Sequence, residues 1–170
     1  MIVLCYDGSA DAQAAVDLVA QTMPGAEVTV LTIWETFLDA MARSNSMAAG
    51  WGYAIGYDDG GKADQANEQA ARDSADAGAE QARAAGLRAQ PRIATRHGGI
   101  AESILREARR LDASLIVVGT RGRGDVKSFL LGSVSHHLVQ HADRAVTVVP
   151  SAELAEQRCQ LHRTEAGSTP

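Results

Sequence analysis

The stretch SLIVVGTRGRGDVKSFLLGSV, residues 114–134, joins a run of apolar residues to a glycine-rich segment. Its first part, SLIVV, is short and rich in β-branched residues, which is typical of a buried strand. Gly119, Gly122 and Gly124 follow directly, and Gly132-Ser133 precedes a helical pattern. Glycine lets backbone approach a ligand closely, and the N–H groups at a helix start bind anions. The stretch therefore favours either a phosphate-binding loop or a plain flexible connection.

Four further apolar runs alternate with helical patterns along the chain. The runs that we expect to form strands are residues 1–6, 28–34, 88–95 and 145–150, and Pro91 favours a position at or near the sheet edge for the third strand in chain order. Helices are indicated between them, from periodicity around residues 12–23 and 100–111 and from composition over residues 63–87. Strands that alternate with helices form βαβ units. The sequence therefore predicts an α/β fold with a parallel sheet.

Two loops are expected to lie together at one edge of this sheet. In parallel sheets, ligands bind beyond the carboxyl ends of the strands, where the strand order reverses. This places Asp7, Gly8 and Ser9, which follow the first strand, near the loop that follows Gly119. Ser133 is expected to cap the helical pattern after it, because a serine side chain accepts a hydrogen bond from the first turn.

The composition excludes several classes of function. The chain of 170 residues suits one domain, and its net charge of −5 offers no basic surface for nucleic acid. No apolar stretch reaches the ~20 residues of a membrane span. Cys5 and Cys159 fit a reducing cytoplasm better than a disulfide framework or a zinc site. No G-x-S-x-G motif or acidic cluster is present, so we expect no catalytic residues and no dedicated metal site.

The pattern Gly119-x2-Gly122-x9-Gly132-Ser133 resembles the nucleotide-binding signature of the ATP-binding universal stress proteins. The resemblance covers residues 1–150, from the opening strand with Asp-Gly-Ser to the final ADRAVTVVP. It implies a single-domain, five-stranded parallel sheet in the order 3-2-1-4-5 with helices on both faces, of the adenine nucleotide alpha hydrolase-like type.

The same resemblance implies which residues surround the nucleotide. Asp7 would contact the adenosine end, Ile33 would line the adenine pocket, and Val118 and Gly119 would lie by the ribose. A carboxylate accepts hydrogen bonds from hydroxyl and amino groups, and apolar side chains suit a flat base. The resemblance places Gly122, Gly132, Ser133 and Val134 around the phosphates. Gly8 and Ser9 belong to the loop after the first strand at the same edge of the sheet, and Arg121 and Arg123 either add positive charge near the phosphates or are solvated loop arginines.

The function implied by the resemblance is that of a cytoplasmic ATP-binding protein that senses nucleotide and regulates the stress response. Mg²⁺ beside the phosphates is compatible with it, and a slow ATPase or phosphotransferase at the same site is the alternative. The family also implies a homodimer, often through the last strand, where Val146 and Val148 alternate with Thr147. An unpaired edge strand readily recruits a second copy of itself.

Two segments depart from the family pattern. Residues 36–62 hold five glycines and show no sustained period, which favours a mobile loop. A lid that brings Trp51, Tyr53 or Tyr57 to the base and a dimer contact are the alternatives. Residues 151–170 read as a short helix followed by a disordered end.

Overall fold

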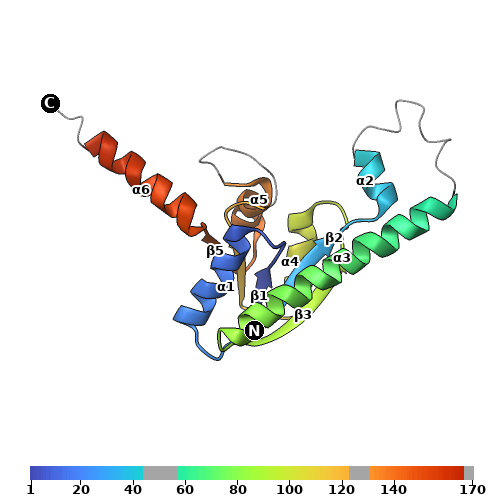
Figure 1. Cartoon of the computed structure of the whole chain (residues 1–170), viewed down its shortest axis with the longest axis horizontal. Coiled ribbons are helices and arrows are strands. Elements are labelled where there is room, and N and C mark those ends of the chain that lie inside the picture. The colour runs from blue at the N-terminus through green and yellow to red at the C-terminus, as the bar shows by residue number, and fades with distance from the viewer. Residues whose placement is uncertain (44–56, 123–130, 167–170) are drawn as a thin grey trace.

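The computed structural model describes residues 1–43, 57–122 and 131–166. One sheet of five strands has the order β3-β2-β1-β4-β5, and every pair in it is parallel (Figure 1). The predicted α/β fold and strand order are confirmed. The strands are β1 (Ile2–Cys5), β2 (Glu27–Trp34), β3 (Arg88–Thr95), β4 (Leu115–Gly119) and β5 (Ala145–Val149).

The centre of the sheet is β1, whose four residues are all buried between β2 and β4. Within the described residues, β3 pairs only with β2, so Pro91 lies in an edge strand as predicted. The chain runs from β1 outward to β3 and then crosses to β4 on the other side. The loops after β1 and β4 therefore meet where the strand order reverses.

Helices cover both faces of the sheet. α1 (Ala10–Thr22) and α3 (Tyr57–Ala84) pack on one face, and α4 (Ile100–Arg110) and α5 (Ser133–His141) pack on the other. The side-chain alternation of β1 decides this arrangement, because successive residues point to opposite faces. Leu4 joins the core with α1 and α3, whereas Val3 joins the core with α4 and α5.

The sequence predicts a loop without regular structure over residues 36–62, but parts of this segment are helical. α2 (Phe37–Arg43) is helical, and α3 begins at Tyr57, earlier than the predicted helix at 63. The Phe37 N–H donates to Asp64 Oδ1 at 2.5 Å, so α2 is bound to the first half of α3. Trp51 and Tyr53 belong to residues 44–56, which lie outside the described part of the chain.

The helix expected after the last strand is α6 (Ala152–Ala166). Leu154 in its first turn is buried, with 2 % of its surface exposed. Beyond this first turn, α6 (red) extends away from the sheet (Figure 1). Residues 167–170, at the end of the segment predicted to finish in disorder, lie outside the described residues.

Candidate functional site

A cavity of about 600 Å³ lies at the carboxyl ends of β1 and β4. Gly8, one of the predicted site residues, does not line it. The other predicted residues do, although they come from four separate places in the chain: Asp7, Ser9, Ile33, Val118, Gly119, Arg121, Gly122, Gly132, Ser133 and Val134.

The turn between β1 and α1 holds Asp7 against the helix start. Asp7 Oδ1 accepts a hydrogen bond from the Ser9 N–H at 3.0 Å, and Ser9 Oγ accepts one from the Ala12 N–H at 3.2 Å as the N-cap of α1. Gly8 between them has a φ of 81°, a conformation that residues with side chains rarely adopt. Gly8 therefore shapes the turn that presents Asp7 and does not itself reach the cavity.

Close contacts explain the glycines at the end of β4. A Cβ on Gly119 would lie 2.8 Å from Asp11 Cβ, in the first turn of α1. A Cβ on Gly122 would lie 2.6 Å from Asp7 Oδ2. Both glycines therefore allow the loop to lie directly against the start of α1. Residues 123–130, with Arg123 and Gly124, are outside the described part of the chain.

The start of α5 forms the next part of the cavity wall. Gly132 is the N-cap and Ser133 is the first helical residue, so the prediction that Ser133 caps this helix is wrong. Gly132 holds the cap position because its N–H donates to the Thr120 carbonyl at 2.9 Å and a Cβ would lie 3.0 Å from that oxygen. The first N–H groups of a helix have no intrahelical acceptor. α5 therefore brings them to the edge of the cavity lined by Ser133 and Val134.

The opposite part of the cavity is apolar. Ile33 lies there, together with Leu31 of β2, Ile100 and Ile104 of α4, and Cys5. Burial raises the pKa of the Cys5 thiol to about 12, and the nearby Asp7 carboxylate acts in the same direction. The thiol is therefore neutral at physiological pH and forms part of an apolar wall.

Sequence reasoning missed several members of the site. The periodicity around residues 100–111 places Ile100 and Ile104 on one face of a helix but does not mark them as site residues. The usable signal was position, because the helix follows a strand at the carboxyl edge of the sheet. Thr120 also lines the cavity, and its Oγ1 is buried with no hydrogen-bond partner among the described residues. Asp11 is 6 % exposed and accepts the Arg121 N–H at 3.0 Å. No local pattern marks either residue.

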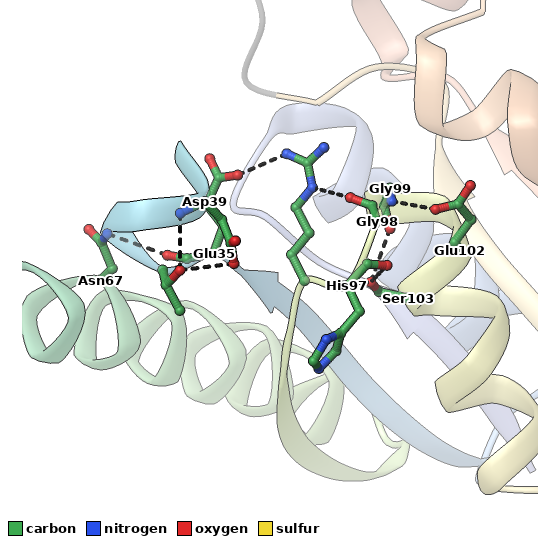
Figure 2. A network of polar contacts seen from close by, with 10 residues as sticks. Glu35, Asp39, Asn67, His97, Gly98, Gly99, Glu102 and Ser103 are labelled. Carbon is green, nitrogen blue, oxygen red and sulfur yellow. Dashed lines mark hydrogen bonds and ion pairs between the residues drawn. The ribbon is translucent and has the colours of Figure 1, made fainter. Parts of the chain in front are cut away.

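A second polar network lies at the ends of β2 and β3, beside the start of α4 (Figure 2). Arg96 donates to Glu35 Oε2 at 2.8 Å and to the Gly98 carbonyl at 2.7 Å. The His97 N–H donates to Ser103 Oγ at 2.9 Å, while the His97 ring points away from these contacts (Figure 2). None of these residues lines the cavity. The network therefore fixes the turn that precedes α4.

Residues 1–43, 57–122 and 131–166 form neither a metal cluster nor a membrane-spanning helix. In these ranges no three His, Cys, Asp or Glu side chains are grouped so that they could hold a metal ion. His137 and His141 of α5 stack their rings, with centroids 4.1 Å apart. No helix within the same ranges is long and apolar enough to cross a membrane.

Residues 1–150 match the family model described as the universal stress protein family. The chain belongs to this family. A universal stress protein of Mycobacterium tuberculosis is 43 % identical over 54 residues, which are 32 % of this chain and 16 % of that protein. One from Synechocystis is 38 % identical over 56 residues, which are 33 % of this chain and 52 % of that protein. Each match thus spans only part of the relative's length.

Solved structures of universal stress proteins share the fold of this chain. One from Archaeoglobus fulgidus has a TM-score of 0.64 at 19 % identity, covering 87 % of this chain and 96 % of that one. A universal stress protein structure from A. fulgidus in complex with dAMP has a TM-score of 0.56 at 18 % identity, covering 87 % of this chain and 95 % of that one. An Arabidopsis thaliana family protein with AMP bound has a TM-score of 0.57 at 13 % identity and covers 88 % and 90 %. This universal stress protein thus has the adenine nucleotide alpha hydrolase-like fold.

Proposed function

We propose that this universal stress protein binds ATP in the cavity at the ends of β1 and β4. The observation that carries the proposal is the division of the cavity into an apolar wall and an edge of glycine backbone and helix N–H groups. A nucleotide is divided in the same way, into a flat base and anionic phosphates. The relatives with AMP and dAMP bound support an adenine nucleotide as the ligand.

The adenosine end belongs to the apolar wall and to Asp7. Ile33 and Ile104 lie on two different elements that line this wall, β2 and α4, and such side chains suit a flat aromatic base. Among the lining residues that the structure describes, Asp7 carries the only carboxylate, a group that can accept hydrogen bonds from a ribose hydroxyl or an amino group. We assign the ribose to Val118 and Gly119 at the end of β4.

The phosphates belong to the loop after β4 and the start of α5. Backbone N–H groups and the positive end of a helix dipole stabilise anions, and Arg121 adds a cation to the same lining. We assign the phosphates to Gly122, Gly132, Ser133 and Val134. A Mg²⁺ ion would be held by phosphate oxygens and water, as is usual for Mg²⁺ in nucleotide sites.

The protein then acts as a nucleotide-responsive regulator. We call residues 119–122 together with Gly132 the glycine loop. Phosphate contacts to this loop exist only when ATP is bound, so ATP favours one arrangement of it. A ligand shifts such an equilibrium by its difference in affinity for the two states. Partner proteins would read the changed surface. Two cysteines without a disulfide fit the reducing cytoplasm, where we expect this regulation to occur.

Calorimetric titration of nucleotide-free protein with ATP, with and without Mg²⁺, tests this function. In Gly132→Val, the added side chain meets the Thr120 carbonyl and blocks the helix start, so we expect affinity to fall about 100-fold or more, or about 2.8 kcal/mol. Gly61→Val is the matched control, because a Cβ on Gly61 meets no atom within 4 Å. Equal affinity in the two variants would show that the glycine loop does not bind phosphate.

We also propose that the protein forms a homodimer through β5. Within the described residues, β5 pairs only with β4, so its other edge has no strand beside it. Val146 and Val148 are only partly buried against the core. A strand edge with this character readily pairs with a second copy. The molar mass in solution tests the proposal.

A further inference from the structure

Asp11 is a buried carboxylate in the first turn of α1. Only 6 % of its surface is exposed, and it does not line the cavity. A buried carboxylate is costly unless hydrogen bonds satisfy its oxygens. The position at the start of a helix contributes some stabilisation through the dipole, but that effect alone is small.

The two oxygens of Asp11 accept hydrogen bonds from two distant segments. Asp11 Oδ2 accepts the Arg121 N–H at 3.0 Å, and Asp11 Oδ1 accepts the Ser151 N–H at 3.1 Å. Hydrogen bonds to a charged acceptor are roughly twice as strong as those between neutral groups. One side chain thus binds the backbone of the β4–α5 loop and the backbone after β5.

The two hydrogen bonds of Asp11 lie at the cavity and at the start of α6. Arg121 lines the cavity, and its carbonyl also accepts a hydrogen bond from Ser9 Oγ at 3.4 Å. Ser151 precedes α6, and its Oγ accepts the Leu154 N–H at 3.4 Å. The carboxylate therefore connects the entrance of the glycine loop to the first turn of the C-terminal helix.

Packing prevents Asp11 from moving with one segment alone. The space for a Cβ on Gly119 is taken by Asp11 Cβ at 2.8 Å and by the Asp11 backbone carbon at 2.9 Å. Beside it, the Thr120 N–H donates to the Val149 carbonyl at 2.8 Å, which holds the ends of β4 and β5 together. A displacement of the loop backbone must therefore change the bond to Ser151 as well.

We infer that Asp11 is a positioning residue that couples the entrance of the glycine loop to α6. Stiffening of the loop stiffens the first turn of α6, and stiffening of that turn stiffens the loop, because coupling between two sites is reciprocal. The ligand that stiffens the loop is ATP, and this part of the inference rests on the proposed function. The coupling itself is a property of the empty protein.

The first experiment measures amide hydrogen exchange by NMR in the nucleotide-free protein. Ser151→Pro removes the N–H that donates to Asp11, whereas Ser151→Ala keeps it and loses only the hydroxyl. We expect the Arg121 amide to exchange about tenfold faster in Ser151→Pro than in Ser151→Ala, because Asp11 loses a partner and becomes more hydrated. Equal exchange of the Arg121 amide in the two variants overturns the inference.

The second experiment adds ATP and follows the amides of the first turn of α6. ATP should slow their exchange in the wild type and in Asp17→Asn, which removes an exposed acid from the same helix. In Asp11→Asn, an amide NH₂ replaces one acceptor oxygen, and we expect the slowing at α6 to disappear. Slowing that persists in Asp11→Asn contradicts the coupling.

The two experiments separate the inference from the proposed function. Failure of ATP to bind the wild type in calorimetry refutes the proposed function, and the Ser151 pair still decides the coupling because it needs no ligand. Should Asp11→Asn fail to fold, the same pair leaves Asp11 in place and decides the question.

Discussion

Glycine serves two different physical purposes in this site. Gly8 needs its positive φ of 81° to form the turn after β1. Gly119, Gly122 and Gly132 have no positive φ and are instead surrounded by close atoms. At Gly119 the nearest atoms include the backbone of α1, which cannot move aside, whereas at Gly122 the nearest atom is the tip of the Asp7 carboxylate. Substitution at Gly119 should therefore disturb the fold, and substitution at Gly122 should displace Asp7.

Thr120 and Thr32 both carry buried hydroxyl groups, and the two groups differ in their hydrogen bonding. The Thr120 hydroxyl has no partner among the described residues, while Thr32 Oγ1 donates to the Tyr6 carbonyl at 2.8 Å. An unsatisfied buried hydroxyl costs free energy, so we expect Thr120→Val to leave stability unchanged or to raise it by up to about 1 kcal/mol. Thr32→Val should lower stability by about 1 kcal/mol.

Urea denaturation of the two valine variants gives the comparison. A loss of stability in Thr120→Val as large as that in Thr32→Val would mean that the Thr120 hydroxyl is bonded in the native protein. Retained stability combined with weaker ATP binding would identify this hydroxyl as a contact of the nucleotide.

At the scale of elements, α3 shows how composition and packing combine. Its many small residues predict a helix that lies close to the sheet, and Ala71, Ala75, Ala79 and Ala82 are indeed buried. The helix also comes close to the sheet at Gly78, where a Cβ would lie 2.7–2.9 Å from the ring of Tyr6, the residue that follows β1. The position of α3 on the sheet thus depends on one missing methyl group.

Two glycine-to-alanine substitutions in α3 should have effects of opposite sign. Alanine is favoured over glycine in a helix by about 1 kcal/mol, so Gly61→Ala, where no atom lies within 4 Å, should raise stability. Gly78→Ala should lower it by about 1–3 kcal/mol, because the methyl group is forced against the Tyr6 ring. Thermal or urea unfolding measures both. Stabilisation by Gly78→Ala would show that α3 lies farther from β1 than described.

At the scale of the whole molecule, the order of the strands creates the site. The chain passes from β1 to β3 on one side of the sheet and returns to β4 on the other, so the loops after β1 and β4 become neighbours. α4 follows β3 and brings Ile100 and Ile104 to the same cavity. The same order leaves β5 at an edge, where a second copy can pair.

The mass of the protein in solution tests the pairing of β5. We expect light scattering to give twice the mass of the chain for the wild type and for Val139→Lys, whose valine is 55 % exposed on α5. Val146→Lys places a charge on the edge strand, which blocks strand pairing, and should be monomeric. Circular dichroism shows whether each variant is folded. A monomeric wild type, or a dimeric Val146→Lys with an intact fold, refutes the interface.

The amino-acid sequence by itself determined the parallel α/β sheet and the two loops at its carboxyl edge, because hydrophobic periodicity and glycine spacing are local properties that the chain carries in any context. It indicated Asp7 and the glycines after β4 for the same reason. Only the tertiary structure decided that Gly132 and not Ser133 caps α5, that Ile100 and Ile104 belong to the cavity, and that Asp11 bonds to Arg121 and Ser151. These depend on contacts between segments as far as 140 residues apart, and no short-range pattern reports such contacts.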